Sequence, residues 1–157
     1  MPLLRAFENK AMVSETKGFV LTEARLQECN AETNGDFDAQ FLNFKEPFCK
    51  SSTLQLYVSD REAPADEAKW LLNEKLCITP VQLYQILKPQ AHGKSGWLPT
   101  ENEDLRMVFF MRNKTHTVRE MRMYYSQRYN VWRVSLAADS DQFPAFTFFI
   151  AEGNALA

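Results

Sequence analysis

The stretch "LRMVFFMRNKTHTVREMRMYY" (105–125) decides how we interpret the fold, because bulky apolar residues alternate in it with arginines. Side chains of a β-strand point alternately to the two faces of a sheet. We therefore expect two strands, at about 105–113 and 117–125, joined by a turn at "NKTH". One face would be core, formed by Leu105, Met107, Phe109, Met111, Met121, Met123 and Tyr125.

Two further strand-like runs follow at 129–136 and 144–151, after short polar breaks. Short breaks between successive strands favour antiparallel neighbours, so the four runs predict a meander. The last run, which contains "PAFTFFI", is apolar on both sides. That pattern indicates burial on both faces, or an edge strand that pairs with a second copy of the chain.

Upstream, "TLQLYVS" (53–59) alternates like a strand, and two helices are expected at 63–76 and 78–89. In the second helix Thr79 is a suitable N-cap and Pro80 suits the first turn. Residues 17–29 fit either a strand or a helix capped by Thr22. Residues 1–17 fit a short helix or an arm, and Asn34-Gly35 predicts a turn.

Together these elements predict a single α+β domain over 1–157, with N-terminal helices packed on one face of a C-terminal antiparallel meander of about four to six strands. Its first part, 1–104, would be a mixed segment with two helices and a long polar loop at 90–104. The meander would occupy 105–151. A loop of that length inside a compact domain indicates a functional role or mobility.

The net charge of −2 hides an uneven distribution along the chain. Residues 1–104 carry 11 Lys and Arg against 16 Asp and Glu, and residues 134–157 carry three acids and no base. Residues 105–133 carry seven cations against Glu120 alone, which gives 7 − 1 = +6. Six of those seven cations are arginines, whose planar fork suits carboxylates and phosphates.

The sheet face opposite the methionines would therefore be cationic with aromatics between. It could be a solvated face, a protein-binding surface or a nucleic-acid surface. The sequence pI of about 5.7, and the lack of glycine in 105–136, weigh against nucleic acid. We predict a small cytoplasmic non-catalytic binding or adaptor protein that contacts an acidic protein first and nucleic acid second. The partner-binding residues would be Arg106, Phe110, Arg112, Arg122, Tyr124 and Arg133.

The rival interpretation is a ligand-pocket domain of the cone-shaped α+β kind, which includes enzymes. Its cavity would lie behind Met107, Met123, Tyr125 and Trp132. A large enclosed cavity there would favour the rival. A filled core with exposed arginines would favour the binding protein.

Other chemistry finds little support. "KPQAHGKS" (88–95) lacks the first glycine of a P-loop, although Gly93, Lys94 and Ser95 form a candidate anion-binding loop. With two histidines and no Cys-x-x-Cys pair, we expect no metal site and no cofactor. The three cysteines are expected to be reduced, and no apolar run is long enough to span a membrane. A homodimer through the C-terminal strand is a further expectation, and the size suits small proteins of phages or bacterial mobile elements.

Overall fold

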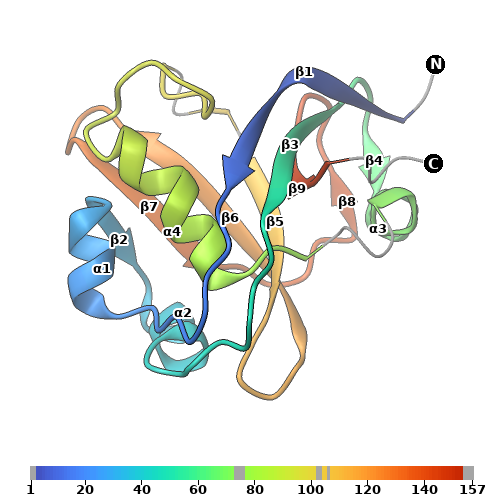
Figure 1. The fold of residues 1–157 in the computed structure, drawn as a ribbon. Coiled ribbons are helices and arrows are strands. Elements are labelled where there is room, and N and C mark those ends of the chain that lie inside the picture. Colours follow the sequence, from blue (N-terminus) through green and yellow to red (C-terminus); the bar gives the residue numbers. More distant parts are fainter. Residues whose placement is uncertain (1–2, 73–76, 102–103, 106, 154–157) are drawn as a thin grey trace.

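The centre of the molecule is a seven-stranded sheet with the order β1-β3-β9-β5-β6-β7-β2 (Figure 1). The computed structural model describes residues 3–72, 77–101, 104–105 and 107–153. The strands of the large sheet are β1 (Leu4–Val13), β2 (Ala31–Thr33), β3 (Ser52–Ser59), β5 (Met107–Arg112), β6 (Val118–Ser126), β7 (Val131–Leu136) and β9 (Phe148–Glu152). A short separate ladder joins β4 (Ala63–Pro64) to β8 (Gln142–Phe143).

Four short α-helices occur within the described residues. They are α1 (Glu23–Glu28), α2 (Gly35–Phe41), α3 (Ala65–Leu72) and α4 (Pro80–Leu87), and a 3₁₀ turn, η2 (Lys88–Gln90), follows α4. None of the helices in this part of the chain has the length and apolar character needed to cross a membrane.

The predicted fold class, helices packed on a C-terminal antiparallel meander, is wrong. The protein is α+β, but its sheet is mixed and draws strands from the whole chain. Only β5, β6 and β7 form the expected antiparallel run. At one end of the sheet β2 pairs parallel with β7, and on the other side of the meander β9 pairs parallel with β5 and antiparallel with β3.

The error lies in the connection after β7. The stretch "AADSDQ" suggested a hairpin, but it leads through β8 and back across the sheet to a central position between β3 and β5. Strand β9 belongs there because both its faces are apolar, and Phe149 and Ile150 are each at most 1% exposed. β9 is therefore a central strand, paired with β3 along its whole length and with β5 at Phe148 and Phe149, and not the edge strand that pairing with a second copy would need.

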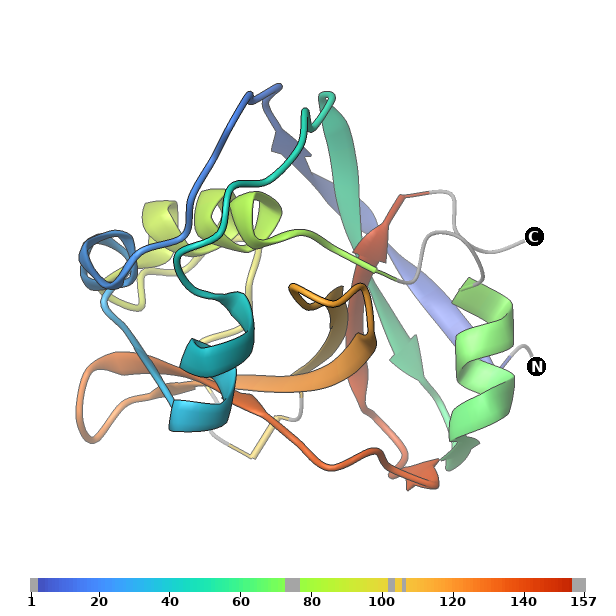
Figure 2. The same ribbon diagram turned by 90° about the horizontal axis from the view of Figure 1, so that it is seen from below.

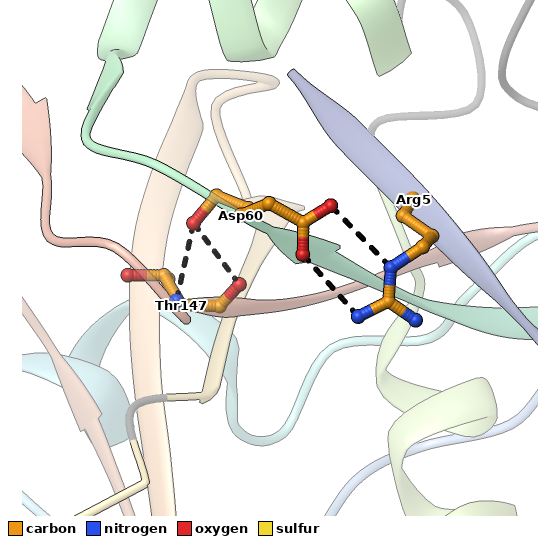
Figure 3. Close-up of polar contacts among 4 residues, drawn as sticks. Arg5, Asp60 and Thr147 are labelled. Atoms are coloured by element: carbon orange, nitrogen blue, oxygen red, sulfur yellow. Dashed lines mark hydrogen bonds and ion pairs between the residues drawn. The ribbon is translucent and has the colours of Figure 1, made fainter. Parts of the chain in front are cut away.

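Residues expected to form a helix or an arm instead form β1, the outer strand beside β3. The start of β1 is held by Arg5, which forms two contacts with Asp60, from Nε to Oδ2 at 3.4 Å and from Nη2 to Oδ1 at 3.2 Å (Figure 3). Beside it, the Thr147 backbone N–H donates to Ser59 Oγ at 3.1 Å. The start of the chain is thereby linked to the segment that leads into β9.

Local signals explain where the helices begin. The Thr22 side chain caps α1, so helix rather than strand is the correct interpretation of residues 23–28. Thr79 caps α4 and Gln82 returns the bond, which completes a capping box. Asn34, expected in a turn, caps α2 by accepting from the backbone N–H of Phe37. An Asn-Gly pair suits both roles, and only the structure distinguishes them.

The sheet is covered on both sides (Figure 2). Helices α1, α2 and α4 pack on one face, over the main core that contains the methionines of β5 and β6. Helix α3 and the β4–β8 ladder pack on the other face, over a second core. A sheet with both faces covered needs apolar residues on both, which explains why every residue from Met107 to Met111 is buried.

The polar loop after α4 is organised by one buried side chain, Gln90. Its Nε2 donates to the carbonyl oxygens of Lys94 and Leu98, both at 2.9 Å, and its Oε1 accepts from Leu98 N at 2.7 Å. The Gln90 carbonyl oxygen accepts from Trp132 Nε1 at 2.9 Å. These bonds tie the loop to the main core through β7.

Candidate functional site

The expected alternation of faces in β6 and β7 is confirmed. Met121, Met123 and Trp132 are at most 1% exposed and belong to the main core. On the opposite face, Tyr124 lies directly across from Arg133, and both side chains are half-buried. Arg122 and Arg133 therefore lie on the face away from the methionines, whereas Arg119 lies on the methionine face and donates to Gln40 Oε1 of α2 at 2.9 Å.

The six predicted partner-binding residues are nevertheless not brought together. Phe110 is 2% exposed in the second core, where its ring meets that of Phe143 edge-on, so no partner at the surface would touch it. Arg112 lies at the far end of β5, beside the hairpin turn. Arg106 lies outside the described residues. The alternation of residues in the sequence placed Phe110 on the correct face of the sheet. It could not reveal that α3 and β8 cover this face where Phe110 lies.

The remaining residues form a smaller surface with two residues from the turn between β6 and β7. Tyr129 is 55% exposed, and the guanidinium carbons of Arg128 and Arg133 lie 5.2 and 5.1 Å from its ring centroid. We call this the arginine–tyrosine surface, formed by Arg122, Tyr124, Arg128, Tyr129 and Arg133. The adjacent Arg128 and Tyr129 could have been included from the sequence as the turn beside Arg133.

Arg122 has a structural role within this surface. Glu120, on the same face, is fully buried and accepts from the backbone N–H and hydroxyl of Ser140 at 2.9 and 2.8 Å. The Nε of Arg122 lies 3.5 Å from Glu120 Oε2, and its Nη2 donates to Ser140 Oγ at 2.9 Å. A buried carboxylate needs such partners, so Arg122 chiefly balances an internal charge.

Arg133 is held more loosely. Its Nη2 lies 3.7 Å from Glu32 Oε2, and both side chains reach solvent. An exposed ion pair of this kind contributes about 0 to 1 kcal/mol. Arg133 can therefore exchange Glu32 for an acidic group of a partner at little cost.

Packing explains why the first residue of the candidate anion-binding loop, Gly93, is a glycine. Gly93 has φ +73°, and a Cβ there would lie 2.3 Å from the ring of Tyr125. Lys94 and Ser95 are exposed, and the Lys94 carbonyl is bonded to Gln90. Glycine is required here because the ring packs against the backbone, and this holds whether or not an anion binds.

The predicted cavity behind Met107, Met123, Tyr125 and Trp132 is filled by packed side chains, because these residues are between 0% and 6% exposed in the main core. The largest hollow that we describe, about 770 Å³, instead lies on the surface between β1 and residues 96–99. Phe7 and Phe148 stack in its wall at 5.5 Å, and the Trp97 indole N–H donates to the Asn9 carbonyl at 3.0 Å. This hollow carries both Arg5 and Glu8, so its charge favours no particular ligand.

Nucleophilic chemistry is disfavoured at the thiols. All three cysteines are free, and burial raises the pKa of each, to about 12 for Cys29. A thiol with a raised pKa forms little of the reactive thiolate. In the part of the chain that the structure describes, no group of three His, Cys, Asp or Glu side chains is placed to hold a metal ion.

Comparison with models of known families, with curated proteins and with solved structures found no match to this chain.

Proposed function

We propose that this protein is a non-catalytic binding protein that contacts acidic groups of a protein partner through the arginine–tyrosine surface. The observation that carries the proposal is Tyr129, a large exposed aromatic ring contacted by the guanidinium groups of Arg128 and Arg133. Tyrosine and arginine are the residues that interfaces enrich, and they contribute most of the binding energy.

The filled main core supports binding over the rival pocket interpretation. The proposed cavity would have needed open space behind Met107 and Met123, and both are 1% exposed among packed neighbours. A binding surface needs only exposed side chains of suitable chemistry. The arginine–tyrosine surface provides three cations against Glu32 and Glu120.

An acidic protein suits this surface better than nucleic acid does. Single-stranded nucleic acid binds by stacking bases on open aromatic faces, and the Tyr129 ring is already contacted by two guanidinium groups. The sequence pI of about 5.7 is also well below the basic values typical of dedicated nucleic-acid-binding domains. A few carboxylates at short range would encounter Arg128 and Arg133 first.

The test uses a fluorescein-labelled polyglutamate peptide, with oligothymidylate of matched charge as the nucleic-acid arm, and measures anisotropy. The variant Arg128→Gln with Arg133→Gln should weaken peptide binding about tenfold, because each exposed charge pair contributes up to about 1 kcal/mol. Salt should weaken the binding of the unmodified protein.

The matched control is Arg61→Gln with Lys17→Gln, which removes two exposed cations elsewhere, one of them paired with Glu67 at 3.7 Å. The affinity of this control for the peptide should fall less than about twofold, because the control changes only the net charge of the protein. Equal losses in the two variants would refute the site. Tighter binding of oligothymidylate than of the peptide would refute the acidic protein as partner.

A further inference from the structure

A second hollow of about 510 Å³ lies beside the β5–β6 turn, where three segments distant in sequence meet. Its lining comes from residues 44–49, 77–80 and 112–116. Small-molecule sites in proteins usually measure about 300 to 1,000 Å³, so this hollow has the size of a ligand site. We call it the basic pocket. None of the five residues of the arginine–tyrosine surface lines it.

Hydrogen bonds fix the walls of the basic pocket. The Ile78 backbone N–H donates to the Phe110 carbonyl at 2.9 Å, which joins the segment before α4 to β5. The Asn113 side-chain amide donates to Gln40 Oε1 at 2.8 Å, which joins the turn to α2. Three elements are therefore held in place around the hollow, so ligand binding would cost little conformational entropy there.

The floor of the basic pocket is apolar. It contains Ile78 and Pro80, both buried, together with Phe44 and Phe48. Phe48 is 54% exposed, so about half of its surface is open to a ligand. An apolar body placed here would cover surface that the chain alone leaves in water.

The rim of the pocket is cationic, because Lys45, Arg112 and Lys114 are among its lining residues, and His116 lies with them. All four are exposed, and the Nη1 of Arg112 donates to the carbonyl oxygen of His116 at 3.4 Å. Among the ion pairs of the described residues, none engages Lys45, Arg112 or Lys114. Within the described residues these three cations therefore have no ion-pair partner, unlike Arg122 and Arg133.

Glu46 is the one acid among the described residues that line the pocket. It is 5% exposed, and its Oε1 accepts the backbone N–H of Val81 at 2.8 Å. Burial raises the pKa of this carboxyl to about 7, against the lowering effect of the Val81 N–H and the Thr79 side chain. Near neutral pH the carboxyl is therefore partly protonated, and it opposes an incoming anion only weakly.

We propose that the basic pocket binds a small organic acid with an apolar body, such as an aryl or alkyl carboxylate. The body would cover Phe44, Phe48 and Ile78, and the acid group would meet Arg112 and Lys114 at the rim. The planar fork of Arg112 suits a carboxylate, and Lys114 adds a second charge. This site goes beyond the proposed function and is independent of it.

The test uses two fluorescent probes with the same aromatic body: 8-anilinonaphthalene-1-sulfonate, which is an anion, and N-phenyl-1-naphthylamine, which is neutral. The anion should bind to one saturable site per chain, at least about tenfold more tightly than the neutral probe. Sodium decanoate should displace it, and decanol should not. A sharp thermal transition in the same sample checks that the probe binds folded protein.

Three variants locate the site. Lys114→Gln and Arg112→Gln should each weaken binding of the anionic probe about fivefold while leaving the neutral probe unchanged. Phe48→Ala should weaken both probes, and because Phe48 is exposed the fold should tolerate the change. The control, Arg128→Gln with Arg133→Gln, should bind the anionic probe normally.

The proposal is overturned if the anionic probe binds without saturation, or if both probes bind equally well. It is also overturned if the control weakens the anion as much as Lys114→Gln does. Lys114 and Phe48 are exposed, and within the described residues neither side chain makes a hydrogen bond or an ion pair; the Lys114 backbone N–H donates to the Gln40 carbonyl at 3.3 Å, a bond that the substitution keeps. If either variant binds the probe more weakly at an unchanged melting temperature, the loss is therefore due to the pocket and not to unfolding.

Discussion

The carboxyl of Glu46 should make this protein less stable as the pH rises from about 5 to 7. Its pKa is raised by burial from the ordinary value of 4.5 to about 7. Between these values the folded state holds a proton that the unfolded state has released. Raising the pH through this window therefore favours unfolding, and the effect is complete by about pH 8, where the carboxyl is ionised in the folded state as well.

The magnitude follows from the shift. One pKa unit corresponds to about 1.4 kcal/mol, so the change from 4.5 to about 7 sets an upper limit between about 3 and 4 kcal/mol. The carboxyl also lines an open pocket, where water screens part of its charge, and we expect about 1 to 3 kcal/mol after that screening.

The assay is urea unfolding of the natural protein and of Glu46→Gln at pH 5, 6, 7 and 8. Glutamine keeps an oxygen that can accept the Val81 N–H but carries no titrating proton. The free energy of unfolding of the natural protein, relative to the variant, should fall by about 1 to 3 kcal/mol from pH 5 to pH 8. Subtracting the variant removes the contributions of other titrating groups. A difference that stays constant, or rises with pH, would refute the reasoning.

Two further predictions concern stability. Arg122→Ala should lower the free energy of unfolding by about 2 kcal/mol, because it leaves the buried Glu120 carboxylate without its cation, and the double variant with Glu120→Gln should recover part of the loss. Chemical denaturation of the four proteins of this cycle measures the coupling, and purely additive effects would argue against it. Gly93→Ala should cost about 2 kcal/mol or more, because its Cβ would lie 2.3 Å from the Tyr125 ring at positive φ. The matched change Gly35→Ala meets no atom within 4 Å and should be neutral or slightly stabilising in the same thermal melts.

The sequence was sufficient for features that depend on near neighbours. Thr79 and Pro80 marked the start of α4, and alternation in 105–125 assigned Met121 and Met123 to the core. These inferences succeeded because capping and strand alternation are determined within a few residues. The double-sided apolar pattern of 144–151 indicated either a strand buried on both faces or an edge strand. The first is correct from Phe148 onward, whereas 145–146 form a turn in which Phe146 is 63% exposed.

The position of β9, the covering of Phe110 and the meeting of Phe48 with Arg112 were decided by tertiary structure alone. Each depends on which distant segment packs against which, and an apolar residue can be buried by any of several partners. The alternation pattern says that a strand has two apolar faces, but it does not say which strands flank it. The same limit applied to the arginines, because the sequence shows their charge and only the folded chain shows which of them already have a glutamate beside them.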